Sequence, residues 1–434
     1  MSKILFWSFS VALAGLLFGF DTIVISGADQ KLQELWNTSD VFHGFVVMAS
    51  ALWGTVAGAI TGGIPTNRYG RKNTLIAIGV LYFVSAVGAA LANDPYTFAF
   101  FRFIGGLGIG ASTIAAPGYI SEIAPPQKRG RLVAMYQLSI VVGILTAFLS
   151  NYLLRNAGEQ PWRYMIGVAA FPSFIYTIAV LFIPNSPRWL VIKGRVAEAE
   201  KVLKMIGQDS DINSFTVERP REALRNENIF MKKYRPALLL AFFIAFFNQL
   251  SGINAILYYA PRIFEEAGIV SSSALLSSAG IGFINVLFTL IGMALIDRLG
   301  RKQLMYIGSF GYILSLTLVA LSFYFGWKGF SVSFFLFVFI AAHAIGQGTV
   351  IWVFIAEIFP THLRAPGQSF GSSVHWVLAA AIPSLIPFLF STVGAGIVFA
   401  FFAIMMVGQL LWVRLKMPET KGISLEEVSR KLTK

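Results

Sequence analysis

Two side chains of opposite charge lie inside long apolar stretches of this sequence. Asp21 interrupts the first such stretch, and Arg102 lies near the start of the fourth. Ionisable groups within a membrane span are costly, so each is by default a functional hypothesis. A carboxylic acid in a low dielectric tends to keep its proton, whereas a nearby guanidinium favours ionisation. A movement that changes their separation or hydration would change the proton affinity of Asp21, which is what coupling a proton to transport requires.

The same two residues have a purely structural interpretation. Asp21 and Arg102 could form a permanent ion pair that only fixes helix packing. Glycines at positions 105, 106, 108 and 110 allow close helix approach in the stretch that carries Arg102, and they fit either interpretation. The chemistry of the pair alone leaves both open.

A second polar group occupies the seventh apolar stretch, which contains Asn248, Gln249, Asn254 and Tyr258. Such groups would be expensive against lipid, so we expect them to face an aqueous cavity. Asn254 and Tyr258 are four residues apart and share a helix face, whereas Gln249 lies roughly 140° away from Asn254 in a straight helix. We therefore expect the helix to unwind near Gly252, so that Gln249 and Asn254 meet one ligand.

Further polar and aromatic residues lie in the middle of other apolar stretches. Neutral amides match vicinal hydroxyls, and an indole face packs on the C–H face of a sugar ring, so the predicted ligand is neutral and polyhydroxylated. For any single residue, interhelical hydrogen bonding or interface anchoring is the alternative. His375 could titrate, but we favour substrate contact because Asp21 already offers an acid. The predicted substrate-binding residues are Phe18, Gln137, Asn248, Gln249, Asn254, Tyr258, Asn285, Trp352, His375 and Trp376.

Membrane helices must position these residues, because the chain is far more apolar than a soluble domain. Of its 434 residues 56% are hydrophobic and 13% charged, and the mean hydropathy is +0.69. Soluble domains carry about 25% charged residues. Apolar stretches of about 20 residues predict twelve transmembrane helices in an all-α protein, near residues 6–27, 42–64, 74–92, 97–121, 131–154, 164–184, 236–260, 275–296, 304–325, 331–357, 367–390 and 395–416.

The basic residues predict the orientation of these helices. With both termini in the cytoplasm, 28 of the 34 Lys and Arg lie on the inner side, 5 lie outside and Arg102 lies within a span. The net charge of +13 then faces an anionic inner leaflet, and we expect no nucleic-acid partner. Zero cysteines exclude disulfides and cysteine-ligated metals, and we expect no metal or cofactor.

Cytoplasmic motifs occur twice, which predicts two similar halves. Asn67-Arg-Tyr-Gly-Arg-Lys72 returns as Asp297-Arg-Leu-Gly-Arg-Lys302, an offset of 230. Tyr119-Ile-Ser-Glu122 returns as Phe354-Ile-Ala-Glu357, with the glutamates 235 apart. Such repeats suggest a carrier whose site opens to one side and then the other. The expected organisation is a six-helix half over 1–184, a cytoplasmic linker with short amphipathic helices over 185–235, a second half over 236–416 and a tail over 417–434.

These motifs, together with Pro184-Asn-Ser-Pro-Arg188, Gln249-Leu-Ser-Gly-Ile-Asn254 and Pro418-Glu-Thr-Lys-Gly422, resemble the sugar porter family of the major facilitator superfamily over essentially the whole chain. The resemblance implies two six-helix halves holding a monosaccharide near the midplane. Asp21 stands where bacterial proton symporters of this family have an acid and passive animal facilitators usually have asparagine, with Arg102 as its partner. The resemblance thus implies a monomeric importer of a proton and a hexose or pentose, such as xylose, glucose, arabinose or fructose, in a bacterial inner membrane.

The resemblance also implies a salt-bridge latch on the cytoplasmic side. Asn67 and Asn185 replace the usual acids of these motifs, so we expect a weaker latch in the N-terminal half. Asn248, Thr349 and His375 also depart from the family pattern, which leaves the sugar open. The predicted latch residues are Arg68, Arg71, Glu122, Arg129, Arg188, Arg298, Arg301, Glu357 and Arg364.

Three other functions compete with a proton-coupled importer. A passive uniporter of the same fold would use Asp21 only for structure. A sugar sensor usually needs a long cytoplasmic extension, and only 18 residues follow Lys416. A membrane-embedded enzyme is disfavoured, because the sequence has no HExxH or GxSxG motif and no nucleophile–base pair in the spans.

Overall fold

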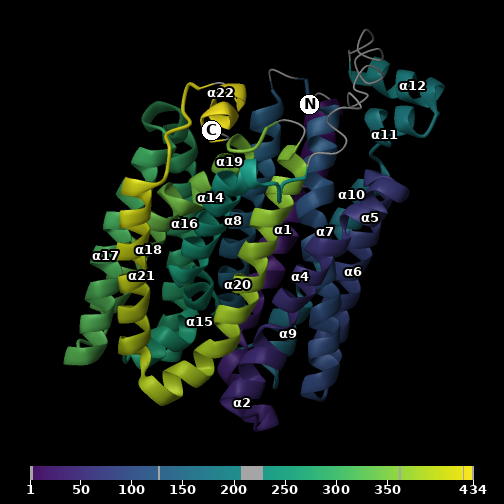
Figure 1. Cartoon of the computed structure of the whole chain (residues 1–434). Helices are drawn as coiled ribbons and strands as arrows, with labels where there is room; N and C mark the ends of the chain where they lie inside the picture. Colours follow the sequence, from purple (N-terminus) through teal and green to yellow (C-terminus); the bar gives the residue numbers. More distant parts are fainter. Residues whose placement is uncertain (1–2, 126–127, 207–227, 361–362, 424, 433–434) are drawn as a thin grey trace. The chain divides into compact units, whose positions relative to one another are not determined.

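The structure is a computed structural model that describes every residue except 1–2, 126–127, 207–227, 361–362, 424 and 433–434. All regular elements among the described residues are helices (Figure 1). They form two compact units. The first unit comprises Met1–Ala28 and Ser50–Arg221, and the second comprises Asp29–Ala49 and Glu222–Lys434.

The first unit contains most of the N-terminal half. Its described helices are α1 (Lys3–Val24), the 3₁₀ turn η1 (Ile25–Gly27), α4 (Ser50–Thr61), α5 (Gly63–Arg68), α6 (Arg71–Leu91), α7 (Pro95–Ile123), α8 (Arg129–Leu154), α9 (Pro161–Gly167), α10 (Ala170–Leu181), α11 (Pro187–Ile192) and α12 (Val196–Ile206). Helix α1 packs along α8, and α4 and α6 pack along α7.

The second unit contains the C-terminal half and a short segment from the N-terminal one. Its described helices are α2 (Asp29–Trp36), α3 (Asp40–Phe42), the π-helix η2 (His43–Met48), the 3₁₀ turn η4 (Lys232–Tyr234), α14 (Arg235–Leu250), α15 (Ile253–Glu266), α16 (Ser271–Leu299), α17 (Arg301–Phe325), α18 (Phe330–Ile345), α19 (Gln347–Glu357), α20 (Arg364–Val393), α21 (Ala395–Leu415) and α22 (Leu425–Leu432). Helix α17 packs along α21 and α18, and α14 packs along α20.

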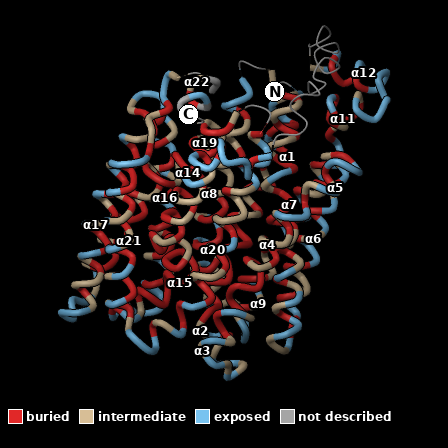
Figure 2. Tube along the Cα trace, in the orientation of Figure 1, coloured by how far each residue is buried: buried red, intermediate tan, exposed pale blue. Residues whose placement is uncertain are grey.

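The described helices confirm an all-α membrane protein. Eleven of them are long and apolar enough to cross a membrane, or twelve when the bent pair Asp40–Met48 and Ser50–Arg68 counts as one span. The 45° bend in that pair lies where the chain passes from one unit to the other, inside the second predicted span. Along the helices, buried and exposed positions alternate, as Figure 2 shows, because each helix presents one face to its neighbours.

Glycines allow the helices of the first unit to approach one another closely. A Cβ at Gly106 of α7 would lie 2.0 Å from the backbone oxygen of Ala51 in α4, and one at Gly110 would lie 2.3 Å from that of Thr55. These are the small-xxx-small contacts by which membrane helices associate through backbone packing. The glycines singled out in the sequence thus have different roles, because Gly105 faces Ser85 of α6 instead.

The segments that the sequence assigns to the linker and the tail contain short helices among their described residues. Helix α12 confirms the amphipathic helix expected in the linker, and its Ala199 and Val202 pack against Trp189 and Leu190 of α11. The rest of that expectation, over 207–227, lies outside the described residues. In the tail, the structure has the short helix α22, and its Val428 is buried. The limits of the linker and tail as separate parts of the chain stay a prediction.

Replacing Gly106 by alanine should loosen the contact between α4 and α7. The added methyl group would overlap the Ala51 carbonyl, so the helices must separate, at a cost of about 1–3 kcal/mol. Gly118→Ala is the matched control in the same helix, because a Cβ there meets nothing within 4 Å. We expect a lower melting temperature of the purified protein for Gly106→Ala and no loss for Gly118→Ala. Equal melting temperatures would contradict the packing argument.

Candidate functional site

The buried acid of the first unit is paired with the buried arginine. Arg102 of α7 donates from Nη1 to Asp21 Oδ1 and from Nη2 to the Asp21 backbone oxygen, each at 2.6 Å. Asp21 is 3% exposed and Arg102 is 1% exposed. One guanidinium therefore bonds both the side chain and the backbone of α1 near its C-terminal end. This geometry confirms that the two residues meet, and by itself it fits either interpretation of the pair.

The second carboxylate oxygen distinguishes this site from a fully satisfied ion pair. Asp21 Oδ2 is buried and has no hydrogen-bond partner in the structure. Gly105 keeps the space beside it open, because a Cβ there would lie 3.4 Å from Oδ2 and 2.4 Å from Ser85 Oγ. A buried polar atom without a partner costs free energy, so such an atom in a native structure calls for an explanation, and a function is one. A proton can be added at Oδ2 while Oδ1 keeps its bond to Arg102.

The predicted helix break lies at Gly252, between α14 and α15 of the second unit. Gly252 has φ +83°, a left-handed backbone conformation that favours glycine, and Ile253 begins the next helix. Phe402 also packs so tightly here that a Cβ on Gly252 would lie 2.5 Å from its ring. The break turns Asn254 toward Gln249, and Asn254 Nδ2 donates to Gln249 Oε1 at 2.8 Å. The structure has the expected break at Gly252, and the two amides lie together there; that they bind one ligand stays a prediction.

Aromatic residues and a histidine surround the Gln249 amide. Gln249 Nε2 lies 3.2 Å from His375 Nδ1 and 3.3 Å from its Nε2. The His375 ring lies 4.9 Å from that of Trp352 and 5.0 Å from that of Trp376, between centroids. Trp352 comes from α19, whereas His375 and Trp376 come from α20, so three separate parts of the sequence meet at Gln249. This constellation has the amides and indole faces that a sugar ring requires.

The remaining predicted sugar contacts are distributed over both units. Tyr258 is fully buried in α15, and Asn285 is buried in α16, where Thr289 donates to its Oδ1 at 3.5 Å. In the first unit, Gln137 of α8 is half-buried, and Phe18 of α1 packs against the hydrophobic core. Their roles as sugar contacts stay predictions.

Four of the predicted latch residues form ion pairs, one pair in each unit. Arg71 bonds Glu122 at 2.9 Å in the first unit. Arg301 bonds both Glu357 oxygens, at 2.7 Å and 3.0 Å, in the second. Among the residues that the structure describes, no ion pair involves Arg68, Arg129, Arg298 or Arg364. The remaining predicted latch residue, Arg188, lies in the short helix α11.

The second unit has the more extensive hydrogen-bond network around its Arg–Glu pair, whereas a weaker latch in the N-terminal half stays a prediction. Glu419 accepts hydrogen bonds from the backbone N–H groups of Arg301 and Lys302, at 3.0 Å and 2.9 Å. Thr420 donates to Glu357, as Ser186 does to Glu122 in the first unit. Burial opposes ionisation of Glu419, but four backbone N–H bonds together outweigh it and hold the pKa of the carboxyl below its usual range.

A buried polar cluster in the second unit was not singled out from the sequence. Asp29 of α2 bonds His43 at 2.8 Å and Arg262 of α15 at 2.7 Å, and each of the three is at most 8% exposed. Arg262 also donates to Gln33. Sequence reasoning treated Arg262 as a loop charge. The signal that could have found it is its spacing, since Asn254, Tyr258 and Arg262 succeed one another at intervals of four.

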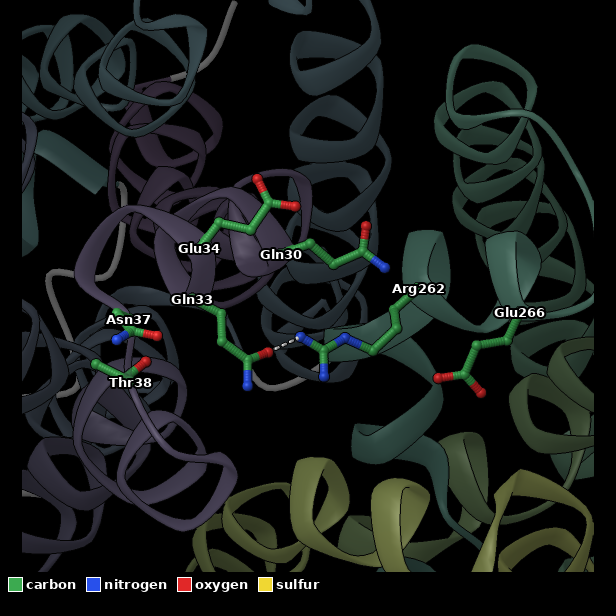
Figure 3. A pocket seen from close by; sticks show the side chains of 7 residues that line it. All are labelled: Gln30, Gln33, Glu34, Asn37, Thr38, Arg262 and Glu266. Atoms are coloured by element: carbon green, nitrogen blue, oxygen red, sulfur yellow. Dashed lines mark hydrogen bonds between the residues drawn. The ribbon is translucent and has the colours of Figure 1, made fainter.

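A polar cavity of about 440 Å³ lies beside this cluster. Figure 3 shows Arg262 reaching across it to Gln33 of α2, with Glu266 on the α15 side. Its other lining residues are Gln30, Glu34, Asn37 and Thr38. The cluster therefore fastens the segment 29–49 to α15 beside this cavity.

The two helical units, the broken helix and the buried acid together define a multi-pass membrane carrier. The family model described as sugar (and other) transporter matches residues 7–432. The chain therefore belongs to the sugar transporter family, within the major facilitator superfamily.

Individual relatives cover nearly the whole chain. It is 34% identical to the arabinose-proton symporter of Bacillus subtilis, over 99% of this chain and 95% of that protein. It is 30% identical to the D-xylose-proton symporter of Escherichia coli, over 96% and 93%. Among solved structures, the partially occluded inward open form of the xylose transporter XylE from E. coli matches with a TM-score of 0.86 and 29% identity, over 98% of this chain and all of that one.

Replacing Glu419 by glutamine tests the network of the second unit. The lowered pKa means that the Glu419 contribution to stability is present above the unfolded value, about 4.3, and is lost as the pH falls through the lower folded value. We expect Glu419→Gln to lower the melting temperature at pH 7, with a difference from the wild type that narrows as the pH falls below the unfolded value of about 4.3.

The control for this pH series is Glu34→Gln. Its pair with Lys31 is exposed, with side chains 71% and 64% accessible, so no measurable effect is expected. If the difference in melting temperature between Glu419→Gln and the wild type stays constant from neutral to acid pH, the charge of Glu419 does not contribute to the stability of the network.

Proposed function

We propose that this protein imports a monosaccharide together with a proton by alternating access. Protonation of Asp21 from outside favours sugar binding, and deprotonation inside resets the carrier. Its proposed location is the plasma membrane of a bacterium, with both termini in the cytoplasm and the monomer as the working form. The relatives named as sugar-proton symporters support the coupling.

One observation carries the proton part of this proposal. Asp21 uses only one carboxylate oxygen on the Arg102 side chain, and its other oxygen is buried without a partner. A structural ion pair gains most when every lone pair is satisfied. The open oxygen is what a reversible proton site needs, and the neighbouring Gly105 leaves room for the proton to arrive.

The sugar part is supported by the cluster around Gln249. Its amides supply hydrogen bonds to hydroxyls, and Trp352 supplies a flat apolar face, without a charged side chain within the cluster. That combination favours a neutral ligand over a phosphorylated or amino sugar. We assign the sugar contacts to this cluster together with Phe18, Gln137, Tyr258 and Asn285.

Internal pH is the measurement that tests sugar and proton together. The purified protein is reconstituted in liposomes that contain a pH-sensitive dye, and xylose, glucose, arabinose, galactose and fructose are added outside in turn. We expect one of these sugars to acidify the interior, because each sugar molecule carries a proton inward. Liposomes without protein are the control.

The outcomes separate the candidate functions. Entry of radiolabelled sugar without acidification would make the protein a passive uniporter, with Asp21 explained by structure. Binding without entry would make it a sensor. If none of the five sugars binds to the protein or enters the liposomes, the proposal is overturned.

Asp21→Asn should abolish uphill accumulation and preserve sugar exchange. Asparagine has nearly the same size and keeps an acceptor oxygen for Arg102, but it cannot exchange a proton. We expect accumulation of the transported sugar to fall at least about tenfold, to the level of equilibration, while counterflow between internal and external sugar stays within about threefold of wild type.

Asp21→Glu is the matched control, because it keeps a titratable group beside Arg102. It should retain part of the accumulation that Asp21→Asn loses. Loss of exchange in Asp21→Asn would assign a structural role to the residue. The two sites must also be linked reciprocally, so the sugar should raise the proton affinity of the wild type and leave Asp21→Asn unaffected.

A further inference from the structure

A chain of buried hydrogen bonds runs from the proposed sugar site across the second unit. Gln249 Nε2 donates to Asn248 Oδ1 at 2.9 Å, and Asn248 Nδ2 donates to Gln347 Oε1 of α19 at 3.5 Å, its longest link. Gln347 Nε2 donates to Gln409 Oε1 of α21, and Gln409 Nε2 donates to Ser309 Oγ of α17, both at 2.8 Å. We call Asn248, Gln347, Gln409 and Ser309 the amide chain.

The amide chain is isolated from water, so its members can be satisfied only by one another and by neighbouring protein groups. Gln347, Gln409 and Ser309 are 0% exposed, and Asn248 is 3% exposed. Turning any one amide by 180° would set two oxygens or two N–H₂ groups against each other in a low dielectric. Such an arrangement leaves buried groups unsatisfied, which costs more than a hydrogen bond contributes. The chain therefore has one favoured direction.

Two backbone carbonyls decide which direction that is. Ser309 gives its only proton to the Met305 carbonyl at 2.7 Å, so its oxygen must accept from Gln409. Independently, Gln347 Nε2 faces the Ile244 carbonyl at 3.5 Å as well as Gln409 Oε1. A carbonyl can only accept. The N–H₂ group of Gln347 is thus held away from Asn248, and its oxygen is turned toward Asn248.

The same polarity is passed on to the residues that face the ligand. With its N–H₂ on Gln347, Asn248 must offer its oxygen to Gln249, so the Gln249 N–H₂ is used on Asn248 and His375. Gln249 Oε1 accepts from Asn254 Nδ2, which leaves a second lone pair on Gln249 Oε1 and the oxygen of Asn254 as acceptors. Gln249 therefore presents its oxygen and no unused N–H to a ligand beside it, whereas Asn254 presents its oxygen and one remaining N–H.

We propose that the amide chain is a positioning device that sets the sugar selectivity of this carrier, by holding Gln249 and Asn254 so that they accept hydrogen bonds from sugar hydroxyls. This inference rests on the proposed function, because it concerns the same site. The ligand that such a site favours carries free hydroxyl groups as donors. A sugar with fluorine in place of one of these hydroxyls keeps its size but would set fluorine against an acceptor oxygen.

Gln347→Met tests the device without touching the site. Methionine fills a similar volume but removes the acceptor that orients Asn248, so the Asn248 and Gln249 amides can turn and present N–H to the sugar. The affinity of the purified full chain is measured by calorimetry for two kinds of ligand. One is the sugar that it transports best among the five above, and the others are the monofluoro derivatives of that sugar.

We expect the wild type to prefer the parent sugar over at least one monofluoro derivative by about tenfold or more, the loss expected when a hydroxyl donor is replaced opposite a buried acceptor. In Gln347→Met that ratio should fall by about three- to tenfold, the range for one buried hydrogen bond. The change in ratio is the essential readout, because a general loss of folding would lower both affinities alike.

Gln409→Met provides a second variant, further from the site. Gln347 keeps its Ile244 contact there, so the ratio should fall less than in Gln347→Met. Because both residues act through the same chain, the double variant should be no worse than Gln347→Met alone. Independent, multiplying effects would overturn the chain as a single device.

Asn151→Leu is the control for loss of a buried amide. Asn151 is 0% exposed and donates to the Val24 carbonyl in the first unit, outside the amide chain. It should lower thermal stability and leave the ratio unchanged. If the wild type binds a sugar and Gln347→Met keeps the wild-type ratio, the inference fails while the proposed function stands. If the wild type binds none of the five sugars, the proposed function fails and the inference fails with it.

Discussion

The cost of an unsatisfied polar group away from water governs this protein. In hydrocarbon or in a dry helix bundle, each N–H, carbonyl or charge must find a partner inside the chain. Arg102 therefore bonds both the side chain and the backbone of Asp21, and Asp29 is held between His43 and Arg262. Asp21 Oδ2 is one of the buried atoms that have no hydrogen-bond partner, and it belongs to the acid to which the proposed function assigns the proton.

The same constraint makes the second unit responsive at a distance. Buried amides that have only protein partners share a single favoured direction, so a serine bonded to its own helix in α17 is connected to the amides at the break of α14 and α15. Without such hydrogen bonds, the helix break at Gly252 would leave backbone and side-chain groups without partners. The tight packing of Phe402 on that glycine shows that the break is built into the fold.

Both units contain an arginine–glutamate pair, but the hydrogen-bond network around it is more extensive in the second unit. Each pairs an arginine with a glutamate near helix ends, and among the described residues the second adds a carboxylate, Glu419, on the backbone at the start of α17. Where the first unit has Asn185, the ring of Trp189 packs on Gly70 and its Nε1 bonds the Asn67 carbonyl. Packing and an indole hydrogen bond thus support the first network in addition to its Arg71–Glu122 pair.

The sequence by itself determined the membrane helices, the break at Gly252 and the residues Asp21, Gln249 and Asn254, because hydropathy, glycine and buried polar groups are local signals. Tertiary structure alone decided which atoms meet. Gln347 and Gln409 are 62 positions apart, and Arg262 and Asp29 are 233 apart, so no periodicity connects them. Whether Asp21 keeps an oxygen free, and which way Gln249 turns its amide, depends on neighbours from other helices, since hydrogen-bond direction is set in space and not along the chain.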